Sequence, residues 1–92
     1  MTAMLTVEAT PDARGWECAV EVSEGAASSR HVVLVRAGDL ERWGRRGETA
    51  EQLVSRAFAF LLAREPASQI LRRFEVSDIS RYFPEFDREI RS

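Results

Sequence analysis

The side chains that most often carry catalysis are scarce in this sequence. Among its 92 residues, His31 is the only histidine and Cys18 the only cysteine, and there is no lysine. A histidine base needs a partner that orients it, a zinc site needs several thiolate or imidazole ligands, and Schiff-base chemistry needs a lysine. Carboxylates are plentiful, but the closest pairs lie in a charged C-terminal stretch that is typical of a solvated surface. We therefore expect no catalytic, metal-binding or cofactor-binding residues, and no enzyme activity.

The basic side chains are all arginines, thirteen in number. Guanidinium groups bind phosphates through paired hydrogen bonds, so clustered arginines are a candidate contact for an anion or a nucleic acid. Residues 70–82 also share features with helix-turn-helix sequences, although Glu75 stands where the turn usually has glycine and Pro84 shortens the second helix. A net charge of −2 disfavours general attraction to nucleic acid. The candidate contact residues are Arg42, Arg45, Arg46, Arg72, Arg73 and Arg81.

Aromatic side chains are concentrated towards the C-terminus, where Tyr82, Phe83 and Phe86 follow Phe74. Two interpretations are open. In the first, this aromatic tail folds back and closes the core over the sheet. In the second, Tyr82, Phe83 and Phe86 form an exposed apolar surface for a protein partner or for a second copy of the chain.

The first third of the chain has the two-residue periodicity of β-strands. Turn residues at 11–15 separate two alternating segments, and a β-branched run at 30–36 predicts a third strand. The short connections predict a three-stranded antiparallel meander over about residues 4–36. Cys18 shares a strand face with apolar residues, so we expect it to be a small core side chain. The apolar positions of the first two strands are Leu5, Val7, Ala9, Trp16, Cys18, Val20 and Val22.

The remainder of the chain predicts helices. A short helix carries Leu40 and Trp43. Thr49 and Gln52 then have the spacing of a capping box, so a long central helix is expected over about residues 50–64. Pro66 ends that helix and is expected to open a short helix to about Arg73, and further short C-terminal helices follow. No linker divides the chain, so residues 1–92 are expected to form a single α+β domain, with the meander packed against the central helix.

The cytoplasm is the expected location. The longest apolar run, residues 57–63, is far shorter than the ~20 residues that cross a bilayer. The N-terminus lacks the basic stretch of a signal peptide. We therefore expect no association with a membrane.

Three segments of the second half resemble a family of small uncharacterised bacterial proteins. They are residues 60–66 (FLLAREP), 70–74 (ILRRF) and 79–86 (ISRYFPEF), which match a signature of the type FLLxREP…IL…F…I…YFPE. The resemblance implies a bacterial, cytoplasmic protein. It assigns no activity, so it transfers no catalytic residue to this chain.

Together these features favour a non-enzymatic protein-interaction module or adaptor. Its partner would be another protein or a second copy of the chain, because a sheet has two edges and the aromatic tail is apolar. A nucleic-acid-binding regulator that uses the arginines is the alternative. An enzyme that works through carboxylates alone is a third and weaker hypothesis.

Overall fold

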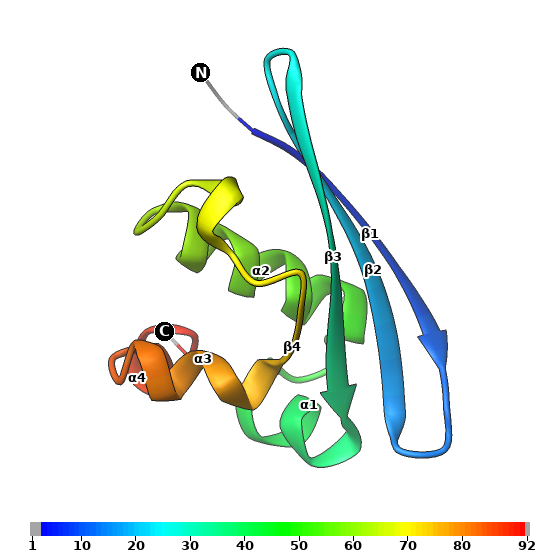
Figure 1. Cartoon of the computed structure of the whole chain (residues 1–92). Coiled ribbons are helices and arrows are strands. Elements are labelled where there is room, and N and C mark those ends of the chain that lie inside the picture. Colours follow the sequence, from blue (N-terminus) through cyan, green and yellow to red (C-terminus); the bar gives the residue numbers. More distant parts are fainter. Residues whose placement is uncertain (1–2, 92) are drawn as a thin grey trace.

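The computed structural model describes residues 3–91, and strands precede most of the helices along the chain (Figure 1). The predicted α+β class is confirmed. The elements are β1 (Met4–Pro11), β2 (Gly15–Glu24), β3 (Ala27–Arg36), α1 (Ala37–Trp43), α2 (Ala50–Leu62), the 3-10 turn η1 (Ala67–Gln69), β4 (Arg73–Glu75), α3 (Val76–Tyr82) and α4 (Phe86–Glu89).

The sheet has four strands in the order β1-β2-β3-β4. Strands β1 to β3 form the predicted antiparallel meander, in which Cys18 lies opposite Ala9 on one side and Val33 on the other. Strand β4 adds a fourth, parallel strand, with Phe74 opposite Val33. The prediction of a three-stranded sheet is therefore corrected to a mixed four-stranded sheet. A strand of three residues shows no periodicity of its own, and its pairing with β3 joins residues about 40 positions apart.

Helix α2 lies across one face of the sheet, and the facing side chains form the core (Figure 1). Its predicted capping box is present: Gln52 N–H donates to Thr49 Oγ1 at 3.1 Å, and Thr49 N–H donates to Gln52 Oε1 at 3.0 Å. The helix ends at Leu62, two residues before the predicted end. Within residues 3–91 no helix covers the opposite face of the sheet (Figure 1).

The C-terminal region differs from the prediction in one element and agrees in the others. Pro66 was expected to open a short helix, but a 3-10 turn forms at Ala67–Gln69 and the chain then becomes extended. Extension lets Phe74 reach the core beside Val33, and this burial outweighs local helix propensity. Helices α3 and α4 are the predicted short C-terminal helices. None of the helices within residues 3–91 is long and apolar enough to cross a membrane.

Candidate functional site

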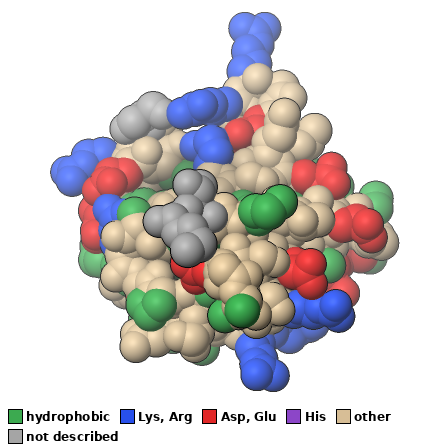
Figure 2. All heavy atoms as spheres, turned by 90° about the horizontal axis from the view of Figure 1, so that it is seen from above, with side chains coloured by type: hydrophobic (Ala, Val, Ile, Leu, Met, Phe, Trp, Pro, Cys, Tyr) green, Lys and Arg blue, Asp and Glu red, His purple; other side chains and the backbone are tan. Residues whose placement is uncertain are grey.

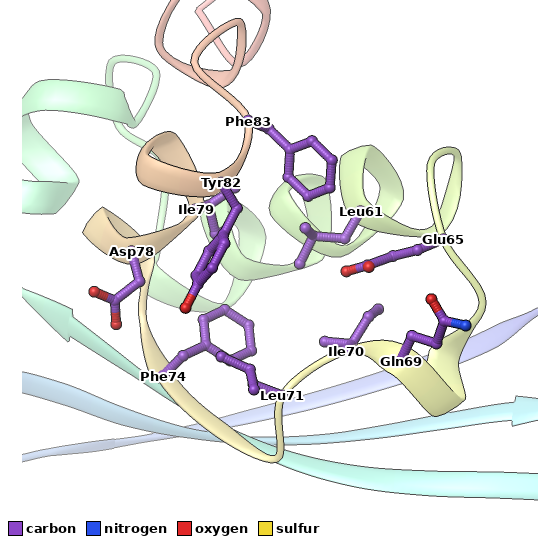
Figure 3. Close-up of a pocket in the computed structure, with 10 residues that line it drawn as sticks. All are labelled: Leu61, Glu65, Gln69, Ile70, Leu71, Phe74, Asp78, Ile79, Tyr82 and Phe83. Atoms are coloured by element: carbon purple, nitrogen blue, oxygen red, sulfur yellow. The ribbon is translucent and has the colours of Figure 1, made fainter.

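A groove of about 370 Å³ opens between the C-terminal end of α2, the segment that leads into β4, and α3 (Figure 3). It exists because the chain turns at Pro66 and returns beside β3, which leaves a gap between the returning segment and the end of α2. The lining residues are Leu61, Glu65, Gln69, Ile70, Leu71, Phe74, Asp78, Ile79, Tyr82 and Phe83.

The groove has an apolar floor and an exposed apolar rim. Leu61, Ile70, Phe74 and Ile79 are buried and form the floor. At the rim, Leu71 is 51% exposed and Tyr82 68% exposed. Only three large apolar side chains are exposed in the described part of the chain, Met4 being the third, and two of them meet at this groove. Such a concentration is typical of a surface that another molecule covers.

Two carboxylates, one amide and the Tyr82 hydroxyl are the polar side-chain groups of the lining, and no arginine is among the lining residues. Figure 3 shows the Glu65 carboxylate reaching into the groove from the end of α2, between Leu61 and Ile70. Asp78 lies on the opposite side, with its carboxylate turned away from the centre. It is already engaged, since its Oδ2 accepts a hydrogen bond from Glu75 N at 3.0 Å.

His31 holds the outer wall of the groove against the sheet. Its Nδ1 lies 2.8 Å from the Leu71 carbonyl oxygen, and its Nε2 lies 2.9 Å from Ser29 Oγ. A carbonyl oxygen only accepts, so Nδ1 carries the hydrogen and donates it. Beside this bond, Val32 N–H donates to the Arg72 carbonyl oxygen at 2.7 Å. Both ring nitrogens of buried His31 are thus engaged, and its Nδ1 holds the segment before β4, a role that no local sequence signal indicated.

The predicted partner surface is divided by the structure. Tyr82 is exposed and Phe83 half-buried, and both line the groove. Phe86 is 0% exposed, so its assignment to a contact surface is corrected. Its ring lies 5.1 Å from Phe60 and 6.0 Å from Trp43 between centroids, and Asp87 accepts a hydrogen bond from Trp43 Nε1 at 2.8 Å. The tail therefore closes the core at Phe86 and presents a surface at Tyr82.

Hydrogen bonding also sets the charge state of the carboxylate that holds this tail. Donation by Trp43 Nε1 lowers the pKa of Asp87, and the nearby guanidinium groups of Arg91 and Arg42 lower it further. Asp87 therefore keeps its negative charge, which anchors α4 to the end of α1.

The candidate nucleic-acid contacts are spread over α1, the loop after it, β4 and α3. Three of them face carboxylates: Arg42 with Asp87 at 3.5 Å, Arg73 with Glu17 at 3.7 Å, and Arg81 with Asp78 at 3.9 Å. Arg45 and Arg46 line a shallow depression together with Glu48 and Glu51, and Arg72 precedes β4. On the face shown in Figure 2, basic and acidic side chains are interspersed.

The remaining candidates for chemistry have structural roles. Cys18 is fully buried, and burial raises the pKa of its thiol to about 11, with a smaller contribution from Glu51. The thiol is therefore protonated at neutral pH and is a poor nucleophile. Among residues 3–91, no three histidine, cysteine or acidic side chains are grouped in a way that could hold a metal ion.

Comparisons with known proteins add no further assignment. No protein-family model matches the chain, and neither the curated proteins nor the solved structures contain a significant match. The functional argument therefore depends on the geometry of the groove.

Proposed function

We propose that the chain is a non-enzymatic protein-interaction module whose groove receives an apolar segment of a partner protein. The observation that carries the proposal is the pairing of two exposed apolar side chains, Leu71 and Tyr82, above a buried apolar floor. A volume of about 370 Å³ suits one or two anchoring side chains. The exposed rim offers further contact area beyond the anchor, as tyrosine often does at interfaces.

Charge favours a different protein over a second copy of this chain. A symmetric dimer through the groove would place the same surface on both sides of the interface. Two copies joined through the groove would bring both Glu65 carboxylates to one interface, and no arginine is among the lining residues to offset them. The absence of an arginine from the lining is therefore the reason to expect a partner of different composition.

Nucleic-acid binding through the arginines is the competing hypothesis. At least three of the six candidate arginines face carboxylates, which reduces the charge that they present to phosphates. We also propose that the chain is a bacterial, cytoplasmic protein, as its resemblance to the FLLxREP family implies. Most of the groove lining lies within the three segments that carry this resemblance.

The experiment is a selection of short random peptides, displayed on phage, against the purified full-length chain. Enriched peptides are synthesised, and their affinity is measured by fluorescence polarisation for the native chain and for the Leu71→Ser/Tyr82→Ser variant. Loss of the two rim contacts should weaken binding at least tenfold, about 1.4 kcal/mol. Both side chains are exposed, so the free energy of unfolding should change by less than about 0.5 kcal/mol per site.

A control variant carries serine at Met4, the third exposed apolar position, which lies on β1 outside the groove lining. It should bind like the native chain. The proposal would be overturned if no peptide were enriched. It would also be overturned if the enriched peptides bound the Leu71→Ser/Tyr82→Ser variant and the native chain equally. Capture of small apolar compounds without any peptide would do the same and would identify a ligand pocket instead.

A further inference from the structure

The Glu65 carboxylate is the charged group that reaches into the groove, and no salt bridge joins it to a basic side chain among residues 3–91. Glu65 follows α2, and its N–H donates to the Leu61 carbonyl oxygen at 2.9 Å, which places it at the end of the helix. Its side chain is half-buried and extends between Leu61 and Ile70 (Figure 3). Apolar surface of Leu61 and Ile70 therefore flanks a carboxylate that is still partly open to solvent.

The arginine that could neutralise Glu65 is directed elsewhere. Arg64 is its immediate neighbour, but the Arg64 guanidinium lies 3.6 Å from the centroid of the Phe60 ring. It also pairs with Glu85 at 3.2 Å and with Glu89 at 2.9 Å. Arg64 is thus committed to holding the tail, and the groove keeps a net negative character.

A ligand that covers the groove must remove water from Glu65. Burial of an unpaired carboxylate is costly, whereas a carboxylate that gains a cationic hydrogen-bond donor on burial is stabilised. The same apolar contacts are therefore available to every apolar segment, but only a segment with a basic group offsets the desolvation of Glu65. An acidic segment would be repelled by Glu65. The groove would therefore reject acidic segments as well as attract basic ones.

We propose that the groove selects protein segments in which an apolar anchor is adjacent to a lysine or arginine, and that this basic group pairs with Glu65. The proposal rests on the proposed function, since it names the chemistry of the segment that the groove receives. The anchor occupies the floor formed by Leu61, Ile70, Phe74 and Ile79, and Tyr82 covers it from the rim. The basic side chain lies towards the end of α2.

The test uses one peptide enriched by the selection, synthesised with its basic residue intact or replaced by glutamine or glutamate. Each peptide is measured by fluorescence polarisation against the native chain and against Glu65→Gln. For the native chain, replacement by glutamine should weaken binding about tenfold, and replacement by glutamate should weaken it further. For Glu65→Gln, the basic and glutamine peptides should bind within about twofold of each other, because removal of either partner already removes the pair.

The matched control is Glu8→Gln, which removes an equal charge from an exposed position on β1 outside the groove. It should preserve the preference for the basic peptide. Enriched peptides without basic residues, or an equal preference in Glu65→Gln and the native chain, would overturn this inference. Those peptides would still bind in a way that depends on Leu71 and Tyr82, so the proposed function would stand. Equal affinity of the peptides for the native chain and for the Leu71→Ser/Tyr82→Ser variant would instead overturn the proposed function.

Discussion

Substitution of Arg56 by methionine should strongly destabilise the domain, because it breaks the most deeply buried ion pair recorded within residues 3–91. The Arg56 guanidinium connects three segments: its Nε and Nη2 each donate to Glu48 at 2.7 Å, its Nη2 donates to the Trp43 carbonyl oxygen at 3.2 Å, and its Nη1 donates to the Ile90 carbonyl oxygen. The Arg56 side chain is 21% exposed and that of Glu48 only 8%. The variant would leave Glu48 buried without its guanidinium partner, although the Arg45 N–H would still donate to it.

The expected loss is about 3–5 kcal/mol, the cost of removing one partner from a buried ion pair. A domain of 92 residues has a total stability of roughly 5–14 kcal/mol, so the variant should be close to unfolding. Urea denaturation followed by tryptophan fluorescence measures the change. The double variant Glu48→Leu/Arg56→Met should recover most of the loss, because it leaves no unpaired charge.

A lower pH should reduce the difference in the free energy of unfolding between the native chain and the Arg56→Met variant. The hydrogen bond from Arg56 lowers the pKa of Glu48 below its ordinary value. The folded state therefore binds fewer protons than the unfolded state as pH falls, and the stabilisation is present above about pH 4.3 and lost as pH falls through the lower folded pKa. Other carboxylates with lowered pKa values are shared by both proteins, so the comparison isolates Glu48.

An exposed ion pair supplies the control for this reasoning. Arg30 and Glu21 lie 3.2 Å apart on the open face of the sheet and are well exposed. Arg30→Met should therefore cost less than about 1 kcal/mol. A cost for Arg56→Met as small as that of Arg30→Met would refute the argument from burial. So would a stability difference that stays constant between about pH 7 and pH 3.

Three further outcomes test the core and the tail. Phe86→Ala should lower stability by about 3–5 kcal/mol in urea denaturation, while Tyr82→Ala should change it by less than about 0.5 kcal/mol, since only Phe86 is buried; equal losses would contradict the division of the tail. Thr49→Ala should cost about 1 kcal/mol by removing the N-cap of α2, as measured by the shift in melting temperature, with Thr49→Ser near the native value. Cys18 should react with a thiol reagent at about pH 8 only after unfolding; rapid reaction of the folded protein would show that the thiol is accessible.

Local sequence patterns predicted the elements that depend on contacts between residues close together in the chain. The alternation around Cys18 predicted a half-buried strand, and the spacing of Thr49 and Gln52 predicted the start of α2. Both are confirmed, because strand faces repeat every two residues and a helix cap involves residues three positions apart. Pro66 likewise marked the end of the central helix, with an error of two residues in its position.

Long-range contacts decided the features that the sequence left open. The segment after Pro66 was predicted as helix, yet parallel pairing with β3 converts part of it to β4, and the bond from His31 to Leu71 holds it there. No periodicity within three residues could indicate a partner strand about 40 positions away. The role of His31 was missed for the same reason.

The sequence by itself predicted an α+β domain, and it holds one histidine, one cysteine and no lysine. It also drew attention to the aromatic tail, where it left two interpretations open. Only the tertiary structure decided between them, placing Phe86 in the core and Tyr82 on the rim of a groove. The reason is that burial is a property of the whole packed chain: α2 and α1 cover Phe86, while the turn at Pro66 leaves the space beside Tyr82 open and directs Glu65 into it.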